Sequence, residues 1–255
     1  MALLTHWDGE PVHVWARVWR AHRVEAHDTL GSTNDRLKEL AAAGAGPYTV
    51  VVADEQTAGR GRTGDVWHSP PGSGLWISVL LPYTGAVPMH LPLLVGVAAA
   101  RAAERSRAGA SVGIKWPNDL QLEGGKLGGI LCEHGHGAVV AGVGLNVRLP
   151  AAGLPAEVGR RATALEASSG ARVSLGNLAT GLLHELHALV PGSARGLDGA
   201  LHRELELRDV LRDRPVLTQQ AGTGTARGIG PDGALLLERT SGERVRVTTG
   251  SVTLA

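Results

Sequence analysis

Three short apolar runs constrain the fold of this chain most. They cover residues 48–53, 75–81 and 139–147, and they are rich in Val and Leu. Continuous apolar runs of about this length, bounded by turn residues, are typical of strands buried within a sheet. We therefore predict a sheet whose strands lie inside the core of the protein.

Helix signals occur between and after these runs. Ser32, with an acid three residues later, marks a helix start, and Gly44 marks its end. Residues 88–109 are predicted to form a second helix. Leucines recur at intervals of three, four and seven residues over 175–189, which predicts an amphipathic helix, and another is expected at about 197–211.

The middle of the chain predicts two shorter strands, at 112–116 and 127–132. They flank turns at Asn118-Asp119 and Gly124-Gly125. The first thirty residues contain Trp7, Trp15 and Trp19 but show no clear period. No element is predicted there.

The pattern changes again from Arg214 onward. Short strands with turns at Pro-Asp-Gly and Ser-Gly-Glu predict a small β-barrel or sandwich. The expected domains are therefore 1–211 and 212–255, with Pro215 marking the boundary.

Composition excludes several classes of protein. The chain has 255 residues, of which 43% are hydrophobic and 19% charged, so it can bury a core and is not a disordered chain. The net charge is +1 without a basic run, which disfavours a nucleic-acid binder. Cys132 is the only cysteine, so a reducing compartment is expected. With no signal peptide and no apolar stretch long enough to span a bilayer, we expect a soluble, cytoplasmic protein without DNA or membrane partners.

A glycine-rich segment follows the first apolar run. Residues 59–64 read Gly-Arg-Gly-Arg-Thr-Gly, but Ser-Pro-Pro-Gly at 69–72 prevents the helix that a dinucleotide fold requires. No glycine run ends in Gly-Lys-Ser/Thr, so a Walker-type phosphate loop is excluded too. Arg60 and Arg62 could close over an anionic ligand, whereas a solvated surface loop is the plain alternative.

Lysine is rare here, since only Lys38, Lys115 and Lys126 occur among 25 basic residues. We predict that Lys115 and Lys126 lie in loops between strands, where a compact ammonium can follow charge between a carboxylate and a phosphate. The alternative for each is a strand-edge lysine that limits aggregation.

Polar residues near these lysines allow more than one role. Asn118 and Asp119 could simply form a turn. Asn146 interrupts an apolar run and must find partners, of which a purine edge is one candidate. Cys132, His134 and His136 lack a distant fourth ligand, so a structural zinc site is rejected.

Five motifs in order and spacing resemble those of the biotin protein ligases (biotin–acetyl-CoA-carboxylase ligases). They are STN at 32–34, GRGRTGDVWHSPPGSGLWISVLL at 59–81, KWPNDL at 115–120, KLGGILCE at 126–133 and GVGLNV at 142–147. The tail at 214–238 is similar to the SH3-like C-terminal domain of that family. The resemblance implies an α+β fold: a mixed β-sheet catalytic domain packed with helices, of the class II synthetase and biotin-ligase type, followed by a small SH3-like β-barrel.

The resemblance also implies an activity. Members of this family join biotin to ATP, with Mg²⁺, to form biotinyl-5′-AMP, and then transfer biotin to one lysine of a biotin carboxyl carrier domain. A monomer or weak dimer is expected. In this chemistry a carboxylate approaches an α-phosphate, so cations must offset the repulsion of two anions.

Site residues follow from the resemblance by position. The implied catalytic residues are Lys126, Arg60, Arg62 and Asp119. The implied biotin-binding residues are Ser32, Thr33, Asn34, Gln56, Arg60, Gly61, Arg62, Lys126, Gly128 and Gly129. The implied ATP- or adenylate-binding residues are Arg62, Trp67, Lys115, Asn118, Lys126 and Asn146, with no dedicated metal site beyond Mg²⁺ brought by ATP. Asp119 is a candidate for orienting or deprotonating the acceptor lysine, or for the metal that accompanies ATP.

Two features depart from the family pattern. Asp65 stands where family members usually carry a basic residue, which lowers the positive charge of the loop. Only 31 residues precede Ser32, too few for a helix-turn-helix domain, so no repressor role is expected.

Two rival functions are a lipoate–protein ligase with the same adenylate chemistry and a non-catalytic biotin sensor. The long loop, KWPNDL and the tail favour biotin, and Lys126 with both loop arginines favours an enzyme.

Overall fold

The structure is a computed structural model that describes residues 3–150, 154–167, 170–194 and 196–255. Its largest sheet has seven strands in the order β3-β4-β5-β9-β8-β7-β6. The strands are β3 (Arg23–Leu30), β4 (Thr49–Gln56), β5 (Gly74–Leu81), β6 (Val112–Lys115), β7 (Asp119–Leu122), β8 (Gly125–Gly135) and β9 (Ala138–Asn146). Only β3 and β4 pair in parallel, and every other neighbouring pair is antiparallel.

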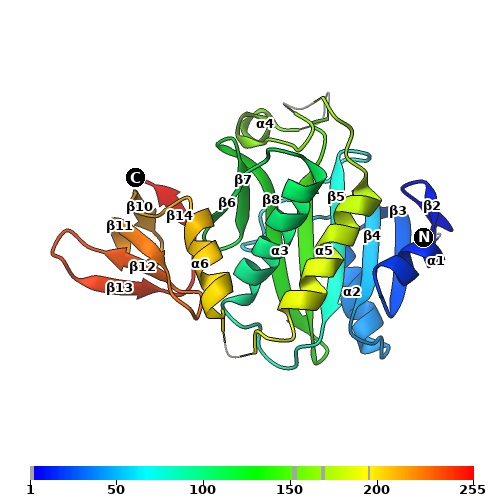
Figure 1. Ribbon diagram of the computed structural model, residues 1–255, viewed down its shortest axis with the longest axis horizontal. Helices are drawn as coiled ribbons and strands as arrows, with labels where there is room; N and C mark the ends of the chain where they lie inside the picture. The colour runs from blue at the N-terminus through cyan, green and yellow to red at the C-terminus, as the bar shows by residue number, and fades with distance from the viewer. Residues whose placement is uncertain (1–2, 151–153, 168–169, 195) are drawn as a thin grey trace.

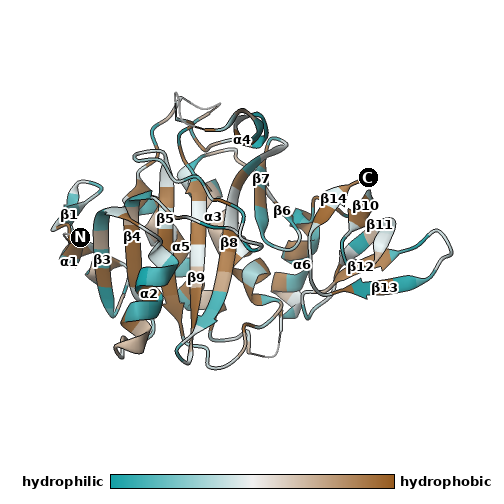
Figure 2. Cartoon of the chain, turned by 180° about the vertical axis from the view of Figure 1, so that it is seen from behind, coloured by the Kyte–Doolittle hydropathy of each residue, from teal (hydrophilic) through white to brown (hydrophobic). Residues whose placement is uncertain are grey.

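Helices cover both faces of this sheet. Helices α3 (Leu91–Ser106) and α5 (Leu175–Leu189) lie together on one face, and α2 (Thr33–Ala42) lies on the other (Figures 1 and 2). Helix α6 (Gly199–Arg208) packs at the β6 edge, and the short α4 (Ala156–Arg161) lies at one end of the strands. Strand β5 and residues 49–53 of β4 are therefore buried on both sides, as their apolar runs predict.

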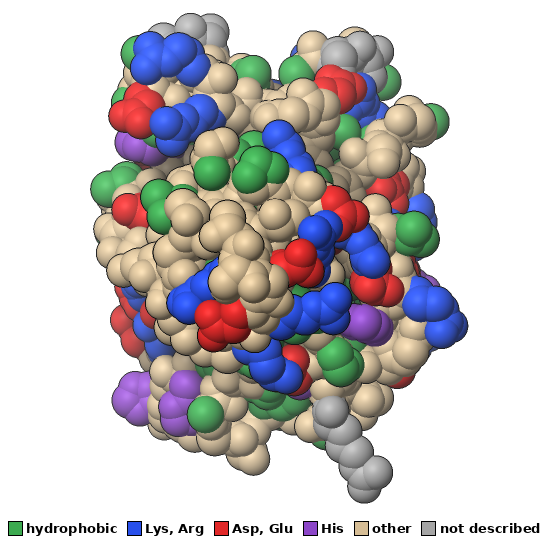
Figure 3. All heavy atoms as spheres, turned by 90° about the vertical axis from the view of Figure 1, so that its left-hand side faces the viewer, with side chains coloured by type: hydrophobic (Ala, Val, Ile, Leu, Met, Phe, Trp, Pro, Cys, Tyr) green, Lys and Arg blue, Asp and Glu red, His purple; other side chains and the backbone are tan. Residues whose placement is uncertain are grey.

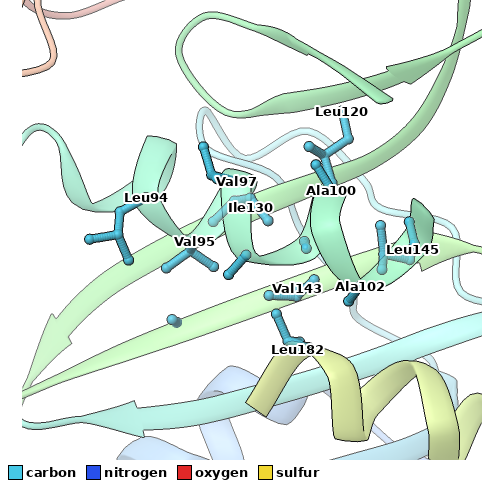
Figure 4. Packing of buried hydrophobic residues seen from close by; sticks show 14 of the residues in the cluster. Leu94, Val95, Val97, Ala100, Ala102, Leu120, Ile130, Val143, Leu145 and Leu182 are labelled. Atoms are coloured by element: carbon cyan, nitrogen blue, oxygen red, sulfur yellow. The ribbon is translucent and has the colours of Figure 1, made fainter. Parts of the chain in front are cut away.

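The main core lies between the sheet and the α3–α5 face. Leu94, Val97 and Ala100 of α3 belong to the same buried cluster as Ile130 and Val143 of the central strands (Figure 4). The two helices approach closely because Gly181 of α5 lies opposite Ala102 of α3, where a Cβ would come within 3.2 Å of the alanine Cβ. This close layer fixes the strands that carry the site on their opposite face.

The first thirty residues, for which no element was predicted, form strands β1 (His6–Trp7) and β2 (Glu10–Pro11), helix α1 (Val12–Val18) and strand β3. Trp7, Trp15 and Trp19 pack on one another, with the Trp15 and Trp19 rings stacked at 5.5 Å. The Trp19 indole N–H donates to Thr180 Oγ1 at 3.0 Å, which ties this segment to α5.

The last part of the chain forms the C-terminal sheet, in the order β13-β12-β11-β10-β14 and antiparallel throughout. Its strands are β10 (Pro215–Thr218), β11 (Gly222–Ile229), β12 (Leu235–Glu238), β13 (Arg244–Val247) and β14 (Val252–Leu254). The Trp116 indole N–H donates to the Gly233 carbonyl at 2.9 Å, which fastens this sheet to the β6 edge. The predicted α+β fold class is confirmed.

Charges of both signs alternate on the outer face of the C-terminal sheet (Figure 3). Arg227 pairs with Asp213 at 2.7 Å and Arg239 pairs with Glu243 at 2.9 Å. No helix of the described residues has the length and apolar character needed to cross a bilayer.

Most predicted elements are present, with shifted ends. The helix expected at 88–109 is α3, Leu91–Ser106, and the one expected at 197–211 is α6, Gly199–Arg208. The prediction that Lys115 and Lys126 lie in loops is wrong: Lys115 ends β6, within the strand predicted at 112–116, and Lys126 is the second residue of β8, just before the strand predicted at 127–132. Strand β7, Asp119–Leu122, was not predicted. Its four residues lie between two predicted turns, and their pairing with β6 and β8 leaves too short a pattern to read from the sequence.

Candidate active site

Two cavities adjoin on the α2 face of the sheet, and they share three lining residues, Val66, Trp67 and Lys126. The first cavity has a volume of about 230 Å³ and the second about 180 Å³. The first is lined by the start of α2, the end of β4, the glycine loop, the central strands and the KWPND segment. Every candidate site residue except Gly128 and Asn146 lines it.

The start of α2 supplies a polar wall of the first cavity. Ser32 caps the helix, its Oγ accepting from the Asp35 N–H at 3.5 Å. Gln56 Oε1 accepts from the Thr33 N–H at 2.9 Å and from the Thr33 hydroxyl at 3.1 Å. Thr33 and Asn34 are each 4% exposed, so their orientation is fixed before any ligand arrives.

Two residues that lie within the motifs but are not among the candidate site residues, Ser78 and Glu133, complete this wall. The Ser78 hydroxyl lies 2.7 Å from Thr33 Oγ1 and 2.6 Å from Asn34 Oδ1. The Asn34 amide donates to Glu133 Oε2 at 2.7 Å and to the Leu131 carbonyl at 3.2 Å. Glu133 therefore sets which end of the Asn34 amide faces Ser78.

The glycine loop folds into a short hairpin, residues 59–67, across the mouth of the first cavity. The Gly61 N–H donates to the Asp65 carbonyl at 2.7 Å and the Trp67 N–H to the Gly59 carbonyl at 2.9 Å. Gly59 has no room for a side chain, because a Cβ would lie 2.5 Å from the Trp67 carbonyl oxygen. We call this segment the glycine hairpin.

The two arginines of the hairpin differ in their partners. Arg60 Nη1 donates to Asp35 Oδ2 at 2.6 Å, and its Nη2 contacts the other carboxylate oxygen and Glu133. Arg60, which the sequence offered as a cation for an anionic ligand, is therefore already paired with acids. Arg62 forms no ion pair with any described residue and donates to the Gly250 carbonyl at 3.3 Å.

These contacts perturb the acid beside the hairpin. Hydrogen bonding to Arg60, reinforced by Lys38, lowers the pKa of Asp35 to about 2. Asp35 and Arg60 therefore stay charged across the physiological range, and their attraction persists whenever the protein is folded.

Lys126 lies where the two cavities meet. Its Nζ is 2.8 Å from Asp119 Oδ1 and 5.4 Å from the centre of the Trp67 ring. The lysine side chain is 40% exposed, so the ammonium is open to a ligand and fixed in direction by one carboxylate. It lines both cavities, and a group bound in either one can reach it.

Trp67 sits on a floor of glycines. A Cβ on Gly144 would lie 2.6 Å from the Trp67 indole nitrogen, and one on Gly129 would lie 3.4 Å from its ring edge. The buried indole N–H of Trp67 has no hydrogen-bond partner among the described residues. An unpaired buried donor costs free energy, so this N–H favours a ligand acceptor beside it.

The second cavity lies on the far side of Trp67 and is walled by α4. Leu154, Val158, Arg161 and Ala162 line it together with His68 and Asn146. The Asn146 amide donates to the carbonyls of Lys126 and Thr163, at 3.3 and 3.1 Å. Sequence reasoning missed the α4 residues, because nothing in their pattern links them to a motif.

Other candidates take structural positions. Asn118 donates to the Ile130 carbonyl at 2.8 Å while lining the first cavity. Gly128 lines neither cavity; a Cβ there would come within 2.5 Å of the Gly144 carbonyl oxygen, so it serves the close pairing of β8 with β9. The C-terminal sheet and the turn before β14 contribute Gly250, Ser251 and Val252 to the first cavity. No motif in the sequence predicted these three lining residues.

No group of three or more His, Cys, Asp or Glu residues in the described ranges could hold a metal ion. Cys132 lies in β8, and burial raises the pKa of its thiol to about 12, so it is not a ready thiolate.

Two family models match the chain. The biotin/lipoate A/B protein ligase family matches residues 27–149, and the biotin protein ligase C-terminal domain matches residues 215–254. These ranges contain the glycine hairpin and the C-terminal sheet respectively. The fold and the adjoining cavities thus define a ligase of the biotin and lipoate class.

Individual relatives narrow this class. The biotin–[acetyl-CoA-carboxylase] ligase of Mycobacterium tuberculosis is 35% identical over 245 residues, covering 92% of this chain and 89% of the relative. The structure of the Aquifex aeolicus biotin protein ligase in complex with biotin and ATP has a TM-score of 0.81 at 27% identity, covering 91% of this chain and 99% of that one. This chain belongs to the biotin protein ligase family.

A bifunctional ligase/repressor BirA from Bacillus subtilis is 40% identical over 156 residues. That alignment covers 58% of this chain and 47% of the relative, so the match spans about half the length of that protein.

Proposed function

We propose that this chain is an ATP-dependent biotin ligase. It joins the biotin carboxylate to the α-phosphate of ATP, releasing pyrophosphate, and then transfers biotin from biotinyl-5′-AMP to one lysine of a biotin carboxyl carrier domain. The observation that carries this proposal is the pair of cavities that meet at Lys126 and Trp67. Two substrates in adjoining cavities can react only where the cavities join, and a cation lies at that point.

We assign biotin to the first cavity. Its ureido group needs both donors and acceptors. Thr33, Asn34 and Gln56 offer both within one network joined through Ser78, and Ser32 lines the cavity beside them. The relatively narrow cavity, of about 230 Å³, suits a small bicyclic acid. Gly61 and Gly129 line the same cavity and let the ligand approach the backbone.

We assign the adenylate portion of the ligand to the second cavity and the junction. Trp67 offers its ring face and an unpaired N–H, and Asn146 and Arg161 line the rest of the cavity. Lys115 and Asn118 line the other side of the junction, from the KWPND segment.

The reaction brings two anions together, so its barrier is dominated by charge repulsion. Lys126 lies at the junction, and Arg62 lines the first cavity without an acidic partner among the described residues. Both are therefore available to the carboxylate and the phosphate. Asp119, at 2.8 Å from Lys126, orients the ammonium and is positioned to accept a proton from the acceptor lysine in the second step.

Magnesium would arrive with ATP. Asp119 and Asp65 are the acidic side chains that line the first cavity, which suits an ion held mainly by phosphate oxygens. Mg²⁺ would supply further charge neutralisation at the phosphates.

We further propose that residues 1–211 form the catalytic domain and 212–255 a domain that closes one side of the cleft. Gly250, Ser251 and Val252 line the first cavity, and Arg62 reaches across to Gly250. The mixed anhydride is sensitive to water, so a wall contributed by the C-terminal sheet would protect it until the carrier lysine enters.

Mass spectrometry of an apo biotin carboxyl carrier domain tests this function. After incubation with the protein, biotin and MgATP, the carrier should gain one biotinyl group on one lysine, with release of pyrophosphate. Lipoate replaces biotin in a parallel reaction. A lipoyl gain without a biotinyl gain would assign the protein to lipoate transfer, and binding of biotin without pyrophosphate release would indicate a non-catalytic sensor.

A further inference from the structure

Four charged side chains from three elements meet beside the glycine hairpin. They are Asp35 and Lys38 of α2, Arg60 of the hairpin and Glu133 of β8, and we call them the anchoring cluster. Lys38 Nζ lies 3.0 Å from Asp35 Oδ1 and 3.3 Å from Glu133 Oε1. Arg60 Nη2 lies 3.4 Å from Glu133 Oε2. Two cations and two anions thus alternate, and the cluster has no net charge to offer a ligand.

Within this cluster the guanidinium of Arg60 is already satisfied. It contacts both oxygens of Asp35 in the two-pronged arrangement that gives strong, directional ion pairs. The Arg60 side chain is 30% exposed, that of Glu133 is 25% exposed and that of Asp35 is 47% exposed, so water weakens the attraction to Asp35 more than the attraction to Glu133. To reach a substrate anion, Arg60 would have to leave two carboxylates.

The cluster also reaches the polar wall of the first cavity. Glu133, which holds Arg60 and Lys38 on one side, accepts from the Asn34 amide at 2.7 Å on the other. Asn34 in turn contacts Ser78 in the buried network. The hairpin and the proposed biotin wall are therefore linked through one carboxylate.

We propose that Asp35 is a positioning residue that acts through Arg60 to hold the glycine hairpin over the first cavity. Arg60 is accordingly an anchor of the hairpin, and Arg62 and Lys126 are the cations that face the reacting anions. One consequence rests on the proposed function: by holding the hairpin closed, the Asp35–Arg60 ion pair slows escape of the biotinyl adenylate from the site.

The first test measures anchoring without any ligand. Hydrogen exchange of the Gly61 and Trp67 amides, both bonded within the hairpin, is compared in the wild type, Asp35→Asn and Glu39→Gln. Glu39 is an exposed acid on the same helix that pairs with Arg36 and not with the hairpin, so it is the matched control. Asp35→Asn should raise exchange about 10-fold, and Glu39→Gln should leave it unchanged. Equal protection in Asp35→Asn and wild type would overturn the inference, whatever the protein ligates.

The second test measures retention of the adenylate by chase with unlabelled biotin. Asp35→Asn, Arg60→Gln and the double variant should each lose labelled biotinyl adenylate about 10-fold faster than wild type, and within about threefold of one another. If Arg60 contacts substrate directly, Arg60→Gln would instead slow adenylate formation while Asp35→Asn resembled wild type, and the double variant would resemble Arg60→Gln. A wild type that forms no adenylate would refute the proposed function, and hydrogen exchange would still decide the anchoring.

Discussion

Replacement of Lys126 by alanine should lower the rate of adenylate formation about 10²–10³-fold, equivalent to about 3–4 kcal/mol of transition-state stabilisation. The reason is the position of the ammonium at the junction of the two cavities, where carboxylate and α-phosphate would meet. Lys126→Arg keeps the charge but replaces a compact group with a wider planar one, so an intermediate loss is expected.

The same substitution should leave the protein folded. The Lys126–Asp119 pair joins side chains that are 40% and 23% exposed, and such pairs contribute about 0–1 kcal/mol. The contact with Trp67, at 5.4 Å, adds about 0.5–1 kcal/mol. At about 2–4 °C per kcal/mol for a chain of this size, the melting temperature should fall by only a few degrees.

The assay is pyrophosphate release on addition of biotin and MgATP, with thermal melting of every variant. Asp119→Asn is the companion variant, because it removes the partner of Lys126 and leaves the ammonium in place. It should slow transfer to the carrier more than it slows adenylate formation. A well-folded Lys126→Ala protein that releases pyrophosphate at nearly the wild-type rate would falsify the role given to this lysine.

Local patterns were sufficient to predict the framework of the fold. The apolar runs at 48–53 and 75–81 are strands β4 and β5, because a continuous apolar run indicates a strand buried on both faces whichever elements cover it. The start of α2 at Ser32 was equally readable, since a cap acts within one turn. The structure around the tryptophans of the first thirty residues could not be predicted, because the Trp19 indole N–H bonds to Thr180, which lies far along the chain.

The same distinction holds for the site. Thr33 and Lys126, which lie in the motifs, and Gln56, which the resemblance added by position, all line the first cavity. The partners of Arg60 could not be predicted, because Asp35 and Glu133 meet it only after α2 and β8 pack on the same side of the sheet. Residue type alone made Arg60 look like a free cation.

Three further predictions concern stability and reactivity. Trp116→Phe removes the donor to the Gly233 carbonyl while keeping a ring, so chemical unfolding should show a loss of about 1–3 kcal/mol. The Cys132 thiol, whose pKa burial raises to about 12, should react with iodoacetamide at pH 8 at least about 100-fold more slowly in the native protein than in urea. The third follows from Asp209, whose Oδ2 is buried without a partner among the described residues and whose pKa burial raises from 3.8 to about 6. The native state therefore binds this proton more tightly than the unfolded state does. The wild-type protein has its full unfolding free energy from this group below about pH 4, and loses that contribution as the pH rises toward and through 6. Asp209→Asn keeps an acceptor for the Leu211 N–H and cannot ionise. Its unfolding free energy relative to wild type should therefore rise by up to about 3 kcal/mol between pH 4 and pH 7, and a difference that stays constant across urea titrations in this range would refute the argument.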